Sequence, residues 1–502
     1  MIAELLAILP GLTAVVGIAY GIWHVWYTRP GLDGTPPGPM GIPFLGYLPF
    51  LGKYPWIGLD KLRKKYPRLV AMFWGNQYTV VLQDYEAVKA FLVEQDENFI
   101  GRPYGFLTKY FSAGKDGEVH NILDMEGPKW KATHDFVMDT YRELGLEAKK
   151  VDGIIVRQAD HMITAFKRHN SGAFDPDPYV YPVTLNVLCG VMFGRELEFN
   201  GEEFKKLTEK NMQAFAAIAG SPIQQYPFLR YIPPFNKDWD ALRYMVEREW
   251  ELFTKEYAQH EQMYKDGAMV DFFDAYIRHI RGNDIKPSLA FQNKDDLICS
   301  TMGLWSAGPE ATNVAILWAI LFMTKYPEVQ RRVNEEIVRV VGPSRPVVSR
   351  DQDDLPYTMA TMYEFLRLGG NAPIGNPRSA FEESEVMGFR IPKRTQIIYN
   401  SWSIHRNPAY WDNPLVFNPE RFLGSDGRVH VPKEFVAFGV GTRFCPGIEL
   451  AKSLMFLVFA NMMQQIEFHK APGHELPPLD EYQFGVSCKP LPFKIRAIQR
   501  SY

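Results

Sequence analysis

The segment from Leu304 to Ile320, LWSAGPEATNVAILWAI, limits the fold of this chain more than any other. Its second half is apolar at helical spacing, as is the preceding DDLICSTMGL, so the sequence predicts a long buried helix. Gly308 and Pro309 interrupt this pattern, and Glu310 follows them. A proline inside a helix costs about 3 kcal/mol, because it loses a hydrogen bond and clashes with the preceding turn. We therefore predict a break in this helix, with a carboxylate at the break.

Size and composition indicate a large protein with an extensive apolar core. The chain has 502 residues, 46% of them hydrophobic and 14% aromatic, which favours more than one domain or lobe. A formal net charge of −3 argues against a nucleic-acid partner bound through bulk charge. Scattered cysteines without a CxxC pair argue against a disulfide scaffold or a zinc module, and they indicate a reducing environment: Cys189, Cys299, Cys445 and Cys488.

The N-terminus has the length and polarity of a membrane span. Residues 5–26 carry no formal charge, and at about 1.5 Å per residue a helix of this length crosses the roughly 30 Å hydrocarbon layer. The alternative is a signal peptide, which would begin with basic residues and have a shorter apolar core. Here Glu4 precedes the run, Arg29 follows it, and aromatic residues gather at its end, as in an interfacial belt. We predict an uncleaved anchor.

The sequence pattern divides the chain into an anchor, a hinge and a body on the cytoplasmic side. We predict a membrane anchor over residues 1–28, a proline- and glycine-rich hinge over 29–46 and one large globular part over 47–502. Within that part, periodicity predicts these elements: strands at 69–75, at 78–85 and between 371 and 399, helices over most of 86–323, and a further helix after Pro446.

The stretch FVAFGVGTRFCPGIELAKSLMFLVFA carries the most informative chemistry. Cys445 lies directly before a strong helical pattern, with Pro446 at the predicted first helical position, where its missing N–H matters little. The positive end of a helix dipole and free backbone N–H groups would stabilise a thiolate there. Gly439, Gly441 and Gly447 allow a tight turn and let a flat ligand approach the backbone.

The pattern Phe438-x-x-Gly441-x-Arg443-x-Cys445-x-Gly447 resembles the heme-binding signature of the cytochrome P-450 superfamily, the heme-thiolate monooxygenases. Five positions agree at fixed spacing, so the resemblance is specific. It implies heme b as cofactor and Cys445 as the axial thiolate ligand of the heme iron.

A second landmark of this family is an ion-pair network beneath the heme. Glu364-x-x-Arg367, together with Arg421 in FNPERF, resembles the Glu-Arg-Arg network of the family. Two side chains three residues apart on a helix share a face. Because a broken buried charge network typically costs about 3–5 kcal/mol, we predict a structural role for these residues.

The resemblance extends from the anchor to Arg496, in the style of microsomal animal enzymes. It implies a mainly helical cytochrome P-450 fold, in which a large helical domain and a small β-rich domain follow an N-terminal transmembrane helix. Residues 47–502 then form the heme-thiolate catalytic domain. The expected location is the endoplasmic reticulum membrane, with a single span and the catalytic domain in the cytoplasm.

The resemblance also names residues around the heme. Trp130, Arg378 and Arg443 resemble the residues that hold the heme propionates. The family often has an arginine four residues after this tryptophan, whereas this chain has His134. His134 is either a propionate contact that depends on pH or a histidine of the core.

The distal helix departs from the family pattern at one position. The stretch Ala307-Gly308-Pro309-Glu310-Ala311-Thr312 resembles the element that delivers protons in the family. The acid, Glu310, is present, but Ala311 replaces the usual threonine. Glu310 and Thr312 are therefore the candidate catalytic residues, and the relay through Thr312 would need a shift of register at the proline.

Three functions follow from this departure. The first is a monooxygenase that hydroxylates or epoxidises a small hydrophobic substrate with O₂. Its electrons would come from NADPH through NADPH-cytochrome P-450 reductase, with cytochrome b5 as a second candidate donor. The second is an O₂-independent isomerase, dehydratase or peroxide-rearranging enzyme, which needs no paired proton delivery. The third is a heme- or sterol-binding protein without turnover, against which the intact cysteine and ion-pair motifs argue.

Substrate regions of similar family members indicate a pocket with apolar walls. An apolar lining suits a small hydrophobic molecule, although an aromatic stripe is also typical of plain core. The candidate lining residues are Phe106, Phe111, Phe215, Trp305, Ala307, Ala311 and Ile374.

Overall fold

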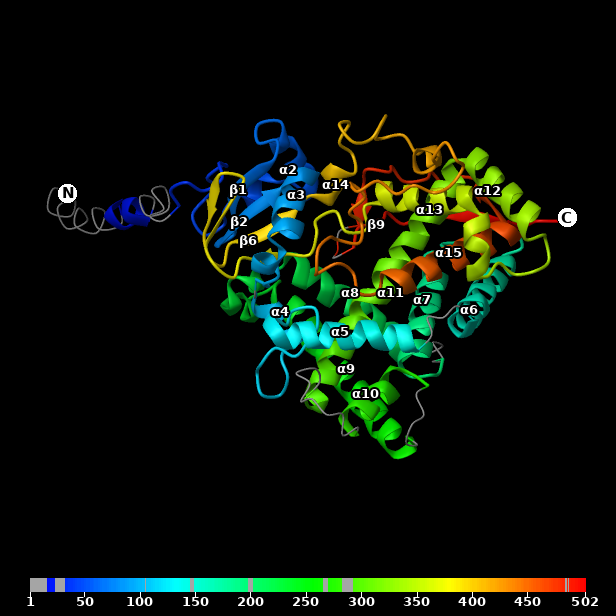
Figure 1. Cartoon of the computed structure of the whole chain (residues 1–502), viewed down its shortest axis with the longest axis horizontal. Helices are drawn as coiled ribbons and strands as arrows, with labels where there is room; N and C mark the ends of the chain where they lie inside the picture. Colours follow the sequence, from blue (N-terminus) through cyan, green and yellow to red (C-terminus); the bar gives the residue numbers. More distant parts are fainter. Residues whose placement is uncertain are drawn as a thin grey trace, which may run out of the picture. The chain divides into compact units, whose positions relative to one another are not determined.

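The chain divides into two compact units. Figure 1 shows a computed structural model of the whole chain. The structure describes residues 16–22, 32–103, 105–144, 149–196, 202–264, 270–281, 292–483, 485 and 487–502. Unit 1 comprises Met1–Pro103, Ile374–Ile404 and Val440–Thr442, and unit 2 comprises Tyr104–Pro373, His405–Gly439 and Arg443–Tyr502.

Unit 1 contains the larger β-sheet, whose strand order is β1-β2-β6-β3. The first pair is antiparallel, β2 and β6 run parallel, and β6 and β3 are antiparallel again. The strands predicted at 69–75, at 78–85 and between 371 and 399 are confirmed. The strands of unit 1 are β1 (Leu69–Trp74), β2 (Gln77–Leu82), β3 (Arg378–Ser379), β4 (Ser384–Val386), β5 (Phe389–Ile391) and β6 (Gln396–Tyr399).

Helices in unit 1 are few and short. They are α2 (Pro55–Arg63), α3 (Tyr85–Lys89) and α14 (Ser401–Ile404), with the short segments η1 (Leu48–Phe50), η2 (Ala90–Glu94) and η3 (Asp96–Phe99). Apolar side chains of α2, β1, β2 and β6 form the core of this unit: Leu51, Leu59, Val70, Met72, Val81 and Ile398.

The proline- and glycine-rich segment predicted as a hinge lies along β1 within unit 1. The Ala71 amide donates to the Pro37 carbonyl at 3.0 Å, and the Tyr47 amide donates to the Phe73 carbonyl at 2.8 Å. A Cβ built on Gly38 would lie 1.6 Å from the Ala71 carbonyl oxygen, so only glycine fits at this crossing. The described part of this segment is therefore tied to the sheet.

Unit 2 is mainly helical, as predicted. Its α-helices are α4 (Phe106–Ser112), α5 (Gly127–Glu143), α6 (Lys149–Lys167), α7 (Asp177–Met192), α8 (Glu202–Gly220), α9 (Asn236–Met263), α10 (Phe272–Arg281), α11 (Lys294–Lys325), α12 (Pro327–Val340), α13 (Pro356–Gly369) and α15 (Ile448–Gln465). Its shorter elements are η4 (Pro222–Gln224), η5 (Pro227–Tyr231), η6 (Ser349–Asp354), η7 (Pro419–Phe422), β7 (Ile466–Lys470), β8 (Tyr482–Gln483), β9 (Lys489–Pro490) and β10 (Ile495–Gln499).

The prediction that Pro309 breaks the distal helix is wrong. The helix α11 runs without interruption from Lys294 to Lys325 and packs against α7, α13 and α15 (Figure 1). An Asn293 capping box closes its first turn. Most of its length is buried on all sides. Packing against its neighbours therefore stabilises the helix at Pro309, where the missing N–H removes one backbone hydrogen bond.

Most of the predicted membrane anchor lies outside the described residues. Residues 16–22 are helical, and the remainder of the 1–28 segment is not described. Among the described residues, no helix combines the length and the apolar character needed to cross a bilayer.

A buried carboxyl lies between α8 and α9. Glu249 is fully buried, and its Oε1 accepts a 3.0 Å hydrogen bond from the Asn211 side-chain amide. Burial raises the pKa of Glu249 to about 8, and the Asn211 bond lowers it only in part. Glu249 Oε2 and Asn211 Oδ1 have no partner among the described residues. A proton on Glu249 supplies the donor that this pair lacks.

We expect Glu249→Gln to remove a loss of stability that the native protein shows as pH rises from the ordinary glutamate pKa to about 8. Unfolded glutamate ionises near its ordinary pKa, whereas folded Glu249 stays neutral up to about pH 8. The stability that this group contributes is therefore complete below the unfolded pKa and is lost as pH rises through about 8. Thermal unfolding midpoints across this pH range should fall less in the variant than in the native protein. Parallel pH profiles would contradict this assignment.

Candidate functional site

The cysteine loop of unit 2 is closed by its own backbone. The Cys445 amide donates to the Phe438 carbonyl at 2.8 Å, and Gly439 has φ 78°, a conformation that favours glycine. The following helix begins at Ile448, with Gly447 as its N-cap, so the prediction that Pro446 opens the helix is wrong by two residues. The reason is local: the Ile448 amide donates to the Cys445 carbonyl at 3.3 Å, which closes a turn over Pro446 and Gly447 before the helix.

Burial dominates the electrostatics of Cys445. It raises the pKa of the thiol above its usual value, and the Gly447 N–H lowers it only in part. The helix end that we expected to stabilise a thiolate is therefore insufficient by itself. A buried thiol of this kind forms a thiolate readily when a metal ion supplies the compensating charge.

The predicted ion-pair network is present and buried in unit 2. Arg367 binds Glu364 through two parallel hydrogen bonds of 2.7 and 2.8 Å, and both side chains have zero exposure. Arg421 adds a 3.1 Å bond to Glu364. The Asn418 amide donates to the same carboxylate at 2.8 Å. This arrangement satisfies both carboxylate oxygens, which a buried charge requires.

The network reaches the cysteine loop through His405. Arg367 donates to the His405 carbonyl at 2.6 Å. Burial, with the charges of Arg367 and Arg406, holds the pKa of His405 well below its usual value. The neutral ring accepts the Val436 amide at 3.0 Å and stacks on Phe435. The ion-pair network therefore positions the chain shortly before Cys445.

Two predicted propionate residues, Trp130 and Arg443, meet in unit 2. The Arg443 guanidinium lies 3.8 Å from the centroid of the Trp130 ring. It also donates to the carbonyls of Ile122 and Met125. Cation–π stacking and these carbonyl bonds hold the guanidinium in one orientation while its charge is retained.

His134 joins this cluster as a neutral side chain. Its ring lies 5.1 Å from the Trp130 ring and 6.1 Å from the Phe444 ring, between centroids. Burial lowers the pKa of His134. Neither ring nitrogen has a hydrogen-bond partner within the described part of the chain, because the Asp135 carboxylate is 3.7 Å away. A buried imidazole whose two nitrogens lack partners can form a hydrogen bond with a polar group of a bound molecule.

Arg378 lies in unit 1, where it is almost fully buried. It donates to Asp96 at 3.0 Å and to the Val440 carbonyl at 2.5 Å. Burial lowers the pKa of Arg378. Asp96 also accepts the Thr442 amide at 2.6 Å. The aspartate therefore fixes both Arg378 and the chain around Thr442.

The middle of α11 exposes only small residues. Ala307, Gly308 and Ala311 are exposed, although the helix is buried before and after them. A Cβ built on Gly308 would meet only Leu188, at 3.8 Å. These three residues, which we call the exposed strip, lie on one face of the helix. A bulky flat group has room beside them.

Glu310 and Thr312 have different surroundings from the exposed strip. Burial raises the pKa of Glu310, and the nearby charge of Lys489 lowers it in part. Glu310 Oε2 is buried without a hydrogen-bond partner among the described residues. Thr312 is buried, and its hydroxyl donates to the Gly308 carbonyl at 3.0 Å. The helix shows no shift of register that would turn Thr312 toward the strip.

A charged cluster fixes the first turn of α11 to α5. The Asp296 carboxylate is 2.6 Å from His120 Nδ1 and 2.5 Å from the Lys129 ammonium. Its other oxygen accepts the Gln292 amide at 2.7 Å. Lys129 directly precedes Trp130, so this cluster connects the distal helix to the propionate candidates along the chain.

The predicted pocket residues have different immediate neighbours. Phe111 packs edge-to-face on Phe215, with ring centroids 6.1 Å apart. Phe106 instead contacts Trp239 and lies under the Arg230 guanidinium. The structure places the remaining aromatic and aliphatic candidates as follows: Trp305 against Phe193 and Phe253 in the core of unit 2, and Ile374 against the core of unit 1.

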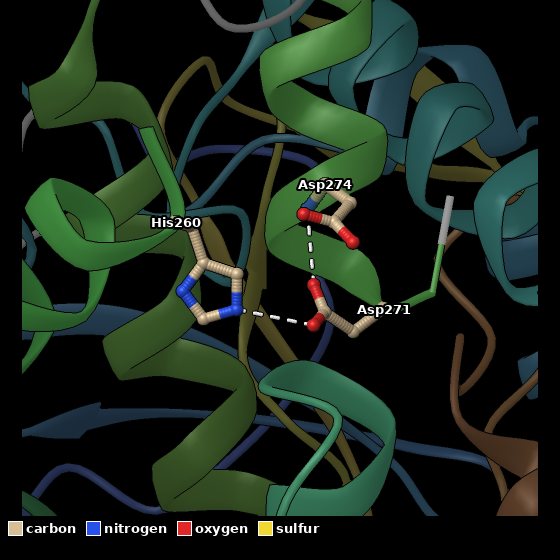
Figure 2. A group of neighbouring side chains, drawn as sticks. All are labelled: His260, Asp271 and Asp274. Atoms are coloured by element: carbon tan, nitrogen blue, oxygen red, sulfur yellow. Dashed lines mark hydrogen bonds and ion pairs between the residues drawn. The ribbon is translucent and has the colours of Figure 1, made fainter. Parts of the chain in front are cut away.

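His260, Asp271 and Asp274 form a further cluster of titratable side chains in unit 2 (Figure 2). His260 Nε2 lies 3.1 Å from Asp271 Oδ2, and Asp271 Oδ1 accepts the Asp274 amide at 3.0 Å. Burial would lower the pKa of His260, but the bond to Asp271 raises it to about 9. The cluster therefore caps the start of α10 and connects α10 to α9. Its role is structural.

Comparison with known proteins identifies the family. A family model described as Cytochrome P450 matches residues 36–497. The chain belongs to the cytochrome P450 family. It is 31% identical to cytochrome P450 2U1 of Rattus norvegicus over 519 residues, which cover 98% of this chain and 95% of that protein. It is 28% identical to cytochrome P450 2J2 of Homo sapiens over 507 residues, which cover 97% and 99%.

Family membership makes this P450 a monooxygenase-type oxidoreductase whose cofactor contains heme iron. The residues present fit that cofactor. Cys445 is a partly buried thiol whose pKa burial raises, so its thiolate form needs a compensating cation, and a Cβ built on Gly447 would meet nothing within 4 Å. Arg443 and His134 offer charge and an unsatisfied ring for acidic groups. The exposed strip leaves space on the distal helix.

Sequence reasoning missed Asp96 and His405. Asp96 holds Arg378, and His405 connects the ion-pair network to the cysteine loop. Both act through partners that are distant in sequence, so no spacing pattern marks them. The only signal for His405 was its place shortly after a predicted strand and before the RNPAYWDNP segment.

We expect Glu364→Ala to destabilise the protein by about 3–5 kcal/mol, because it leaves two buried arginines without their carboxylate. Loss of the thiolate-type heme spectrum should accompany this effect, since His405 and the cysteine loop depend on the network. The matched control is Glu335→Ala, which removes a surface pair with Arg331 at 2.7 Å. That control should cost under about 1 kcal/mol. Equal free energies of unfolding for the two variants would disprove the assignment.

Proposed function

We propose that this P450 hydroxylates or epoxidises a small hydrophobic substrate with O₂. Its electrons come from NADPH through NADPH-cytochrome P450 reductase, with cytochrome b5 as a second donor. Residues 1–28 anchor the enzyme in the endoplasmic reticulum membrane, with the catalytic domain in the cytoplasm. The observation that carries this proposal is the exposed strip in the middle of α11, next to Glu310, whose pKa burial raises.

Bound heme iron with a thiolate ligand would supply the oxygen chemistry. In this proposal Cys445 is the thiolate, held by the Gly447 N–H and by the closed loop around it. Trp130, His134, Arg378 and Arg443 hold the acidic groups of the heme. Phe438, Gly441 and Gly447 shape the loop against which it lies.

The proposed role of Glu310 is that of proton donor. Burial raises its pKa, which brings a carboxyl closer to the pH at which it can both hold and release a proton. The Thr312 hydroxyl is bonded to the Gly308 carbonyl, which supports a role in holding the helix around the exposed strip. Phe111 and Phe215 are the aromatic pair best suited to line the substrate pocket.

The test of this function is product formation by the purified heme protein with its reductase. A spectral binding screen of a fatty acid, a sterol, a terpene and a small aromatic compound selects the substrate. We expect an oxygenated product only when both O₂ and NADPH are present. Cys445→Ser should abolish the ferrous–CO absorption typical of a thiolate ligand and the product with it. Turnover without O₂ and NADPH would refute the proposal.

The second candidate function is O₂-independent isomerisation, dehydration or peroxide rearrangement. Ala311 favours it, because this residue of the exposed strip has no hydroxyl. The Thr312 hydroxyl does not take over that position, since it is bonded to the helix backbone. Such reactions need no paired delivery of protons to oxygen. Product formation from an oxime or a fatty-acid peroxide under nitrogen would support this candidate.

We expect Ala311→Thr to separate the two candidates. A hydroxyl on the exposed strip adds a proton-positioning group, so a monooxygenase should form more product per NADPH consumed and release less peroxide. An O₂-independent enzyme should gain nothing. The control is Thr312→Val, which removes a hydroxyl bonded to the helix backbone and should change this ratio little. A large loss in the control would instead assign the relay to Thr312.

A further inference from the structure

The segment of α11 that carries Glu310 contacts a partly buried ion pair through Asn313. Lys489 of β9 and Asp177 of α7 are 2.5 Å apart, between the ammonium nitrogen and Oδ2. The side chain of Lys489 is 7% exposed and that of Asp177 is 37% exposed, so the pair extends from the interior toward solvent. Asn313, one turn after Glu310, places its amide 3.4 Å from Asp177 Oδ1.

The backbone next to Lys489 is fixed to α11. The Trp318 indole donates to the Cys488 carbonyl at 2.9 Å, and the Cys488 amide donates to the Asn371 carbonyl at 3.0 Å. The Asn371 side chain in turn donates to the Ala311 carbonyl at 3.0 Å. These three bonds hold the chain at Lys489 against the same part of α11 that carries Glu310.

We infer that Lys489 and Asp177 are positioning residues that control when the Glu310 carboxyl holds a proton. The cation favours the ionised carboxyl, while Asp177 partly neutralises the cation and connects it to solvent. This inference rests on the proposed function for its consequence in turnover, but the charge coupling exists in the resting protein.

Charged groups from two elements other than α11 act on Glu310. Lys489 lowers its pKa and Asp177 raises it, in addition to the larger effect of burial. Tyr181 of α7 is a further titratable group near Glu310: burial, with a smaller contribution from that carboxyl, raises the pKa of Tyr181, so the phenol stays neutral. The two ionised neighbours thus act on Glu310 with opposite signs.

Because Lys489 and Asp177 shift the pKa of Glu310 in opposite directions, removing each charge should shift the titration of Glu310 in opposite directions. An ion pair with a purely structural role would not produce these opposite shifts. The carboxyl C=O stretch of protonated Glu310 is identified in infrared spectra of the heme protein by its loss in Glu310→Gln. Its titration midpoint should rise by about 1 pH unit in Lys489→Met and fall in Asp177→Asn. The pH at which turnover declines should shift in the same directions. Midpoints that stay unchanged, or move the same way in both variants, would overturn the inference.

Two further variants keep the test decisive. Lys489→Arg retains the cation and should leave the midpoint near that of the native protein, even if Lys489→Met folds poorly. Arg345→Met breaks a comparable pair with Asp351 (2.9 Å) elsewhere in unit 2 and should leave the midpoint unchanged. A midpoint shift in the Arg345 variant would refute the specific coupling. If no oxygenated product forms under any condition, the infrared midpoints still decide this inference, and only the proposed function fails.

Discussion

The two parallel hydrogen bonds between Arg367 and Glu364 are the contact on which unit 2 depends most. Both side chains are fully buried, so neither charge has water as an alternative partner. Arg367 also binds carbonyls of the chain that returns after unit 1, including that of His405. Because His405 then receives the Val436 amide, one guanidinium fixes both the network and the approach to Cys445. The Glu364–Arg367 ion pair therefore positions the Cys445 thiol indirectly, through His405 and Val436.

The sequence predicted the local features well. The strands of unit 1 and the helices of unit 2 follow from short-range periodicity, the Glu364–Arg367–Arg421 network follows from the resemblance to the family motif, and the structure contains them. Spacing works for these features because each depends on residues within one or two turns, or on a motif that matches at fixed intervals.

Features that depend on tertiary packing escaped prediction. The intact α11 shows that burial against α7, α13 and α15 outweighs the local cost of Pro309. The N-cap shift at Gly447 goes with a turn in which the Ile448 amide donates to the Cys445 carbonyl. Asp96 and Lys489 find their partners in segments remote in sequence, Arg378 and Asp177, so no local pattern marks them.

The unbroken helix around Pro309 has a consequence for hydration. In a regular α-helix the carbonyl of Trp305 accepts from the amide four residues later, and here that residue is a proline without an N–H. That carbonyl therefore lies outside the regular i+4 ladder, two residues before the exposed strip. A buried carbonyl in this position costs stability unless another group or an ordered water donates to it. The proline thus makes the hydration of the helix at this point depend on what lies next to Trp305.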